Sequence, residues 1–192
     1  AQRREESIQD VPLAVSAFSA DNLKTQRIET GQDLLKAVPN VNFSRANFGG
    51  YNFQIRGIGT KLVATSADAA IGIHVNNMPL TANSLADSEF YDVERVEVLR
   101  GPQGTQFGRN TTGGLVNIVT NKPTDEFAAR ISGELGNYNT KRASGMINLP
   151  MGGGFALRAA GTYLKRDGFY DNTITGNDID DRNLWSTRLT LG

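Results

Sequence analysis

The C-terminal part of the chain alternates between apolar and polar residues with a period of two. The segments "FAARISGELG", "KRASGMINL" and "FALRAAGTYL" are each close to the length of a tilted membrane strand, about ten residues. Such alternation places successive side chains on opposite faces of a strand. In the first segment one face carries Phe127, Ala129, Ile131, Gly133 and Leu135, and the other carries Ala128, Arg130, Ser132 and Glu134. The pattern predicts antiparallel strands with one apolar and one polar face.

The connections between these segments differ in length. "GNYNT" and "PMGGG" are tight turns, whereas "KRDGFYDNTITGNDIDDRN" is long and polar before "LWSTRLTLG" resumes the alternation. Short turns on one side and a long loop on the other indicate an outer-membrane barrel, with Tyr138, Tyr163 and Trp185 placed for its aromatic girdles. A soluble β-sandwich is the alternative, because it also buries one face of each strand. Four strands cannot close a barrel, so the barrel interpretation requires further strands.

Upstream, strand and helix signals mix. We place the domain boundary near "NKPTDEF", residues 121–127, because Pro and Asp interrupt the β pattern there. "VPLAVSAF" alternates as a half-buried strand does, and "VNFSRA", "FQIRGIG" and "AIGIHVNNMPL" are further short strands, the last with a turn at Asn76 and Asn77. The upstream part is therefore expected to be a compact unit with several short strands.

Two short helices are expected between these strands. Ser19 is placed to cap the first, over "ADNLKTQR". Thr30 and Asp33 form a variant capping box for the second, over "GQDLLKAV", which Pro39 ends because the residue before proline avoids the helical region. Together with the strands, these helices predict an α+β unit.

Composition excludes several classes of function. The 20 basic and 20 acidic residues cancel, so the chain lacks the charge excess of a nucleic-acid binder. It has no cysteine, which excludes disulfide scaffolds, thiol catalysis and zinc–thiolate sites. His74 is the single histidine, and in "GIHVNN" we expect a packed or solvated strand residue. No apolar run reaches about 18 residues, so no transmembrane helix is expected, and the start "AQRREES" indicates a processed, trimmed or truncated chain.

The most distinctive stretch is "VERVEVLRGPQGTQFGRNTTGGLVNIVT", residues 93–120, in which a glycine-rich link joins two β-rich runs. The link lacks the order of a phosphate-binding loop and is followed by a strand, so nucleotide binding is not expected. Among nearby carboxylates, Asp92 and Glu94 are interpreted as a helix start, and residues 178–181 as a solvated loop. We expect no metal site, no cofactor and no enzymatic activity.

Five motifs resemble, in order and approximate spacing, the plug domain of TonB-dependent outer-membrane receptors: "VPLAVSAFSADNL", "DLLKAVPNVNF", "FQIRGIGT", the stretch 93–120, and "NKP". The resemblance implies an α+β plug domain over residues 1–123, a small mixed sheet with short helices. It implies that residues 124–192 are the first antiparallel strands of a large transmembrane β-barrel, of about 22 strands when complete. It also implies location in the outer membrane of a Gram-negative bacterium.

The same resemblance assigns roles to two arginines. Arg56 in "QIRGIG" and Arg100 in "VLRGPQG" match plug arginines that resemble latches onto glutamates of the barrel wall, which would lie beyond Gly192. Hydrogen bonds and ion pairs suit a movable plug, because water replaces them when the plug shifts. The alternative for both residues is an ordinary ion pair within the domain.

Other residues are expected to shape turns or to face the nutrient. The turn and packing glycines are Gly57, Gly101, Gly104, Gly108, Gly113 and Gly114. The stretch 44–52 has the polar and aromatic chemistry of a binding surface, with a plain solvated turn as the alternative; its candidates are Arg45, Asn47, Phe48, Tyr51 and Asn52. Residues 58–70 are a second candidate loop.

The partners implied are the TonB energy-transducing protein in the periplasm, outer-membrane lipid, the remaining barrel of the same parent chain and a small-molecule nutrient. The nutrient classes are ferric siderophore, cobalamin, haem and oligosaccharide. A coupling box is not visible and is expected upstream of Ala1. The alternative is a surface binding or adhesive protein, or a signalling receptor, with the same plug and barrel plan.

Overall fold

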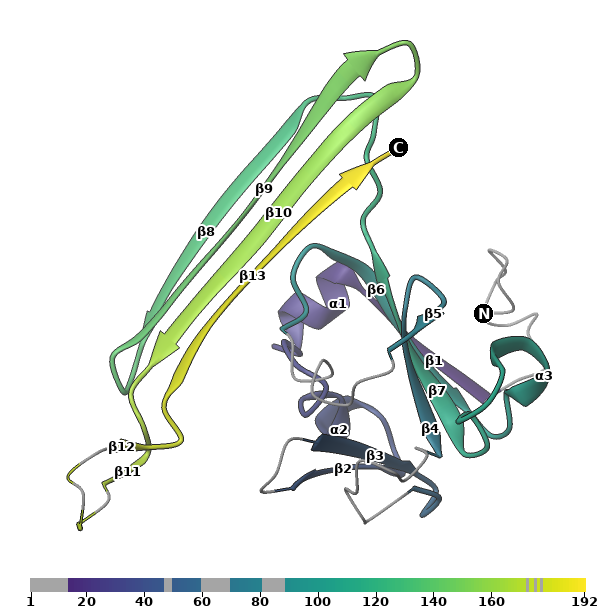
Figure 1. Cartoon of the computed structure of the whole chain (residues 1–192), viewed down its shortest axis with the longest axis vertical. Helices are drawn as coiled ribbons and strands as arrows, with labels where there is room; N and C mark the ends of the chain where they lie inside the picture. Colours follow the sequence, from purple (N-terminus) through teal and green to yellow (C-terminus); the bar gives the residue numbers. More distant parts are fainter. Residues whose placement is uncertain are drawn as a thin grey trace. The chain divides into compact units, whose positions relative to one another are not determined.

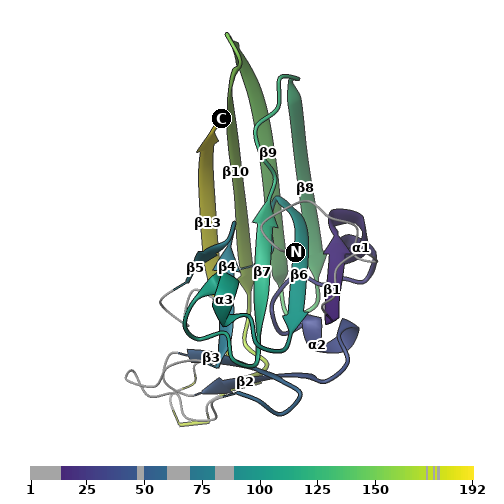
Figure 2. The same ribbon diagram turned by 90° about the vertical axis from the view of Figure 1, so that its right-hand side faces the viewer.

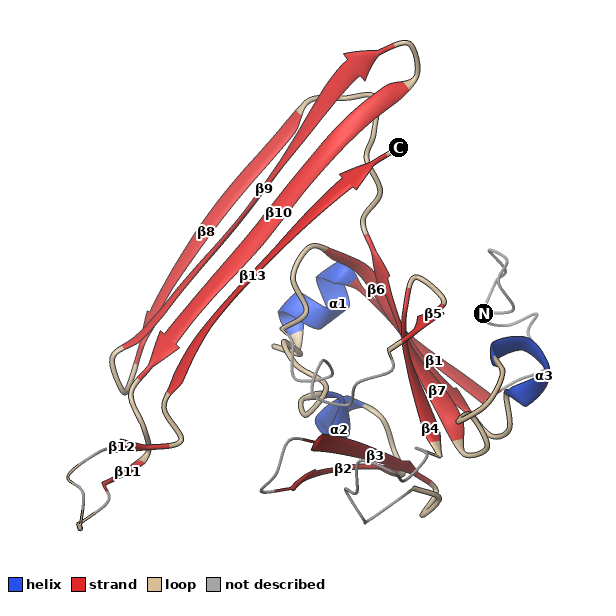
Figure 3. Ribbon diagram, in the orientation of Figure 1, coloured by secondary structure: helices blue, strands red, loops and turns tan. Residues whose placement is uncertain are grey.

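A computed structural model describes residues 14–46, 50–59, 70–80, 89–171, 173–174, 176 and 178–192. The chain divides into two compact units, Ala1–Thr120 and Asn121–Gly192. Figure 1 and Figure 2 follow both units in sequence colours, and Figure 3 shows that the short helices belong to the first unit and that the second is built of strands. Among the described residues, no helix is long and apolar enough to cross a membrane.

The first unit is organised by a five-stranded sheet in the order β1-β6-β7-β4-β5. Strand β7 pairs antiparallel with β6 and parallel with β4, so the sheet is mixed, as predicted. A separate antiparallel hairpin joins β2 and β3. The strands are β1 (Ala14–Ser19), β2 (Val41–Ala46), β3 (Gly50–Ile55), β4 (Ile71–Val75), β5 (Met78–Pro79), β6 (Val93–Arg100) and β7 (Gly114–Thr120).

Helix α1 (Ala20–Thr25) begins as predicted, because the Ser19 hydroxyl accepts a hydrogen bond from the Asn22 amide at 3.3 Å. Helix α2 (Leu34–Ala37) begins later than the sequence suggested. The Asp33 carboxylate accepts from the Thr30 amide at 3.0 Å, which is one half of a capping box. It also accepts from the Thr30 hydroxyl at 2.9 Å, so this hydroxyl donates where the other half needs it to accept. Helix α2 ends before Pro39, as predicted.

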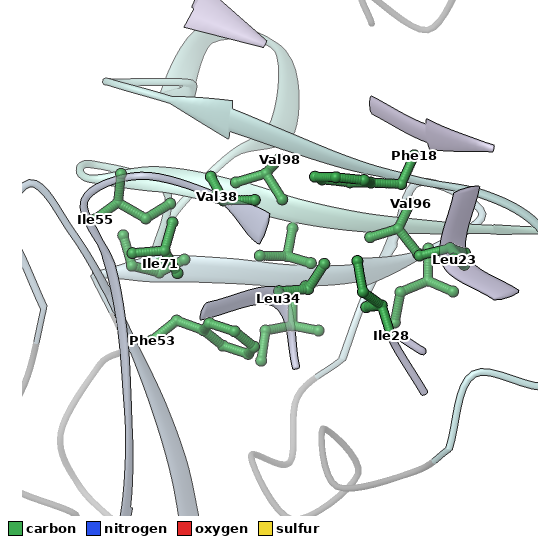
Figure 4. Close-up of a cluster of buried hydrophobic side chains, with 14 of the residues drawn as sticks. Phe18, Leu23, Ile28, Leu34, Val38, Phe53, Ile55, Ile71, Val96 and Val98 are labelled. Atoms are coloured by element: carbon green, nitrogen blue, oxygen red, sulfur yellow. The ribbon is translucent and has the colours of Figure 1, made fainter. Parts of the chain in front are cut away.

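Beta-branched and aromatic residues from every layer of the first unit meet in one core (Figure 4). Val96 and Val98 of β6 face Ile118 and Val116 of β7 in register, and all four are buried. Leu34 of α2 packs into the same cluster, which also takes in Leu23, Ile28, Val38, Phe53, Ile55 and Ile71. The core lies on one face of the sheet, between the strands and the segment that carries α1, α2, β2 and β3.

The second unit is an open antiparallel sheet in the order β13-β10-β9-β8. Its strands are β8 (Ala128–Gly136), β9 (Thr140–Gly152), β10 (Phe155–Arg166) and β13 (Arg182–Leu191). The register pairs Ile131 with Gly145, Ala159 with Ile147 and Ala159 with Leu189, so the predicted apolar positions share one face. A short hairpin, β11 (Tyr170–Asp171) and β12 (Asp178–Ile179), lies within the long loop.

The two tight turns of this sheet lie at opposite ends. Lys165 pairs with Lys141, so the β8–β9 turn and the long β10–β13 connection share one end, and the β9–β10 turn lies at the other (Figure 3). The sequence interpretation grouped both tight turns on one side, which was wrong. Strands that run up and down must place consecutive turns at alternate ends.

The structure also corrects two local interpretations. Glu94 lies inside strand β6, and Asp92 precedes it with φ 49°, so these carboxylates start a strand and not a helix. Beta-branched valines at 93, 96 and 98 outweigh the local acidic pattern. Between β6 and β7 the expected irregular link contains a one-turn helix, α3 (Gly104–Phe107).

Candidate functional site

The second face of the first unit's sheet carries polar residues where a simple sheet would be apolar. Glu97 of β6 lies opposite Asn117 of β7, and both are buried. Towards one end of this face Leu99, Leu115 and Phe107 form a small cluster, which helix α3 covers through Phe107. The sheet is therefore buried on both faces. One face packs in the large apolar core, and the other carries a polar layer.

Glu97 is held by partners on two strands, β6 and β7. Its carboxylate accepts from Arg95 Nε at 2.7 Å and from Asn117 Nδ2 at 3.3 Å. The Asn117 amide also donates to Asn77 Oδ1 at 3.1 Å, and its oxygen accepts from the Asn77 backbone N–H at 3.1 Å. Arg95 makes a second ion pair with Glu94. The network ties β6 and β7 to the turn between β4 and β5.

Arg95 stays charged within this network. Burial lowers the pKa of its guanidinium, but the hydrogen bond to Glu97 and the charges of Glu97 and Glu94 outweigh burial and raise the pKa above its ordinary value. A raised pKa in the folded state stabilises the fold at every pH below the unfolded value. Arg95 therefore stays protonated across the physiological pH range, so its ion pairs are not weakened there by loss of its charge.

A second set of contacts fixes the end of β7. Asn76 and Asn77 have φ values of 51° and 65°, the left-handed geometry of the turn that the sequence predicted. Asn76 Oδ1 accepts from the Thr120 amide at 2.9 Å, and its Nδ2 donates to the Thr120 hydroxyl at 3.0 Å. Thr120 is the last residue of the first unit, so this turn secures the point at which the chain leaves that unit.

His74 is a buried residue of strand β4, as expected, with its ring edge-on to Phe107 at a centroid distance of 5.5 Å. It packs beside the polar network and beside helix α3. Among the described residues no cluster of His, Cys, Asp and Glu could hold a metal ion.

Arg56 and Arg100 both lie where strands end. Arg56 follows β3 with φ 53°, is exposed, and donates its backbone N–H to Asn40 O at 2.8 Å. Arg100 ends β6, is half-buried, and donates from Nε to Ala14 O at 3.4 Å. Within the part of the chain that the structure describes, neither guanidinium forms an ion pair.

The fold brings these two arginines to the same end of the first unit. Gly114 is the register partner of Arg100. The Cδ1 atom of Ile55, the residue before Arg56, lies 2.8 Å from where a Cβ of Gly114 would stand. The end of β3, directly before Arg56, thus packs on the start of β7, which pairs with the end of β6 at Arg100.

The other candidates fall in different settings. The side chains of Arg45, Tyr51 and Asn52 and the whole of Asn47 and Phe48 lie outside the described residues, as does most of the second candidate loop. Positive φ angles occur at Gly57, Gly101, Gly108 and Gly114, and Gly113 is crowded by Ile71 at 2.6 Å from an added Cβ. Gly104 has neither feature, because it begins α3 with open space around it.

Comparison with known proteins agrees with this architecture. The model of the TonB-dependent receptor plug domain matches residues 7–115. The chain belongs to the TonB-dependent receptor family. The pesticin receptor of Yersinia pestis is 29% identical over 186 residues, which cover 94% of this chain and 26% of that receptor. The metal-pseudopaline receptor CntO of Pseudomonas aeruginosa is 32% identical over 156 residues, covering 79% of this chain and 20% of the relative.

A solved structure gives the same result. The ferric yersiniabactin uptake receptor FyuA from Yersinia pestis superposes with a TM-score of 0.76 at 27% identity, covering 92% of this chain and 28% of that one. The chain thus spans about a quarter of the length of these relatives. TonB-dependent receptors are outer-membrane proteins of Gram-negative bacteria and not enzymes, so this chain is assigned to that membrane, with a plug domain followed by early barrel strands.

Proposed function

We propose that this chain is the N-terminal part of an active-transport receptor that binds a scarce nutrient at the cell surface and admits it to the periplasm. The observation that carries the proposal is the joining of a plug unit to an open sheet with one apolar face in a TonB-dependent receptor. We assign the plug the role of closing the transport path in the complete receptor. Transport then requires the plug to move, and we assign that work to a pull from TonB.

The polar layer of the plug supports this role. A pull must rearrange contacts without exposing a large apolar surface, and water replaces broken hydrogen bonds more readily than it solvates apolar side chains. The contacts of Glu97 and Asn117 are of the replaceable kind, whereas the cluster around Val96 and Val98 is not. The plug is thus suited to partial rearrangement, with its apolar core kept intact.

Ferric siderophores are the nutrient class that we favour. The relatives named above include a ferric yersiniabactin receptor and a metal-pseudopaline receptor, and a cobalamin transporter of Vibrio vulnificus is 25% identical over 177 residues. Cobalamin, haem and oligosaccharide remain the alternatives that the experiment separates. Any iron would enter inside its chelator as cargo.

The proposal is tested by uptake in a strain that carries the complete receptor as its only route for the probe. Radiolabelled ferric yersiniabactin, ferric pyoverdine, cyanocobalamin, haemin and a maltodextrin are supplied separately, with and without a functional TonB. We expect one iron chelate to accumulate at least tenfold more in the strain with TonB. Binding without TonB-dependent accumulation of any probe would contradict transport and favour a surface binding protein.

We further propose that Arg56 and Arg100 latch the plug to glutamates of the barrel wall. Their place at one end of the plug, with no ion pair to another described residue, supports this assignment. Arginine suits the role because its planar fork binds a carboxylate through two hydrogen bonds.

In the complete receptor, changing both arginines to alanine is expected to raise pore conductance in planar bilayers, by about tenfold for each lost charged hydrogen bond. Arg100→Lys should lie between wild type and Arg100→Ala, since it keeps the charge and loses the fork. Arg109→Ala is the matched control, because Arg109 is an exposed plug arginine in the link between β6 and β7. Conductance and uptake equal to wild type in the double variant would refute the latch.

A further inference from the structure

The apolar face of the second unit's sheet carries two charges, both on lysine. By register, its positions include Ile131, Ile147, Leu157 and Leu189, and across all four strands its charged residues are Lys141 on β9 and Lys165 on β10. All six arginines of residues 121–192 occupy the opposite, polar face. The lysines therefore stand apart from the polar lining of the barrel.

Lys141 and Lys165 lie directly opposite each other. They are register partners in the β9–β10 ladder, both are exposed, and neither forms an ion pair with another described residue. Like charges placed directly opposite on a sheet destabilise it. An anion bound between the two ammonium groups would reverse that effect, because each lysine presents three hydrogen-bond donors on a flexible stem.

The height of the pair on the sheet matches the edge of a bilayer. From Lys141 to Met151 on β9 is ten positions, about 33 Å of strand. At a tilt of about 40° this becomes about 25 Å, the height of the apolar band of an outer-membrane barrel. The lysines therefore sit at one rim of the band, and the long β10–β13 loop at their end marks that rim as the outer one.

The next row of the same face is aromatic. Tyr163 lies opposite Trp185, two residues inward from Lys165, and Trp185 is 73% exposed. Aromatic side chains of this kind occupy the level of lipid headgroups, with cations just beyond them. Figure 3 shows the sheet end that bears this arrangement, next to the β8–β9 turn.

We propose that Lys141 and Lys165 form a binding site for the phosphate groups of lipopolysaccharide in the outer leaflet. The occupant follows from charge and place: a site of two cations at the outer rim faces a leaflet whose main lipid carries phosphorylated sugar headgroups. Ammonium–phosphate hydrogen bonds are charge-assisted and strong. The site depends on the barrel fold and on which rim faces outward, and it is independent of the nutrient and of TonB.

The test uses the complete receptor, folded and purified in detergent, with bound lipid counted by native mass spectrometry. Added lipopolysaccharide should bind wild type, and the double variant K141Q/K165Q should lose at least fivefold in occupancy. K141R/K165R should retain binding, because it keeps both charges. The control K24Q/K122Q removes the same charge outside the sheet and should bind as wild type does.

Three comparison ligands identify the source of the phosphate. Enzymatically dephosphorylated lipopolysaccharide should bind wild type as weakly as intact lipopolysaccharide binds K141Q/K165Q. Phosphatidylglycerol that binds equally well, or inorganic phosphate that displaces lipopolysaccharide at millimolar concentration, would overturn the assignment. Equal occupancy in wild type and K141Q/K165Q, with both barrels folded by heat-modified gel mobility, would also overturn it.

Discussion

Replacing Gly114 by alanine is expected to destabilise the plug by about 3 kcal/mol or more, among the larger effects of a single substitution. Gly114 begins β7 at φ 148°, and a Cβ there would lie 2.4 Å from the Leu99 carbonyl oxygen and 2.8 Å from Ile55 Cδ1. The first of these contacts is backbone in a paired strand and cannot move aside. Hydrogen exchange of the β6 and β7 amides in the complete receptor measures the loss.

Two neighbouring glycines separate the causes. Gly101 has φ 97° and no atom within 4 Å of an added Cβ, so Gly101→Ala adds backbone strain alone, about 1 to 2 kcal/mol. Gly104 has neither strain nor crowding, so Gly104→Ala should be neutral or stabilising by up to about 1 kcal/mol. Three equal effects would show that crowding at Gly114 is relieved by movement of β6.

Arg95→Ala is expected to destabilise the plug by about 2 kcal/mol at neutral pH. The substitution leaves the Glu97 carboxylate buried with Asn117 as its remaining hydrogen-bond partner among the described residues, and it also removes the ion pair with Glu94. Breaking one partner of a buried pair costs more than the pair contributes, because the remaining charge stays desolvated. Unfolding of the complete receptor in urea, followed at the plug by hydrogen exchange, gives the value.

The matched controls are Arg109→Ala and the pair Arg95→Met with Glu97→Met. Arg109 is exposed, and its loss should change stability by less than about 0.5 kcal/mol. The double methionine variant removes both charges and should recover much of the loss, since no buried carboxylate is left. If Arg95→Ala and Arg109→Ala were indistinguishable, Glu97 would not depend on Arg95.

The strands of the second unit could be predicted because each has one apolar face and one polar face, so apolar and polar residues alternate strictly along its sequence. Positions such as Ile131 and Arg130 carry the signal within the strand itself. The same holds for Ser19 and for the Asn76–Asn77 turn, where local hydrogen bonding and positive φ determine the residue type.

Glu97 and Asn117 could not be predicted as a buried pair. Glu97 lies between Val96 and Val98, and Asn117 lies between Val116 and Ile118, a pattern typical of a strand with one wet face. Their burial depends on residues distant in sequence, since Glu97 pairs with Asn117 across the sheet and Asn117 with Asn77 in the β4–β5 turn. Helix α3 was missed for a related reason, since a single turn that contains a glycine shows no helical period.

The arrangement of Arg56 and Arg100 could be predicted only in part. Their sequence positions before glycine could be found from the motif, and the structure places both at strand ends. Their place at the same end of the plug could not be found, because it depends on Ile55 packing over Gly114, which has no room for a side chain.

The position of β1 determines the order in which the plug would come apart. This strand lies at the edge of its sheet and has β6 as its one neighbouring strand, whereas β7 is paired on both sides. Tension on the chain before Ala14 therefore detaches β1 first and leaves β6, β7 and β4 joined. The Ala14 carbonyl that accepts from Arg100 departs with β1. Detachment of β1 would thus release Arg100 from its neighbour inside the plug, and this edge of the sheet would be the first part of the plug to yield under tension.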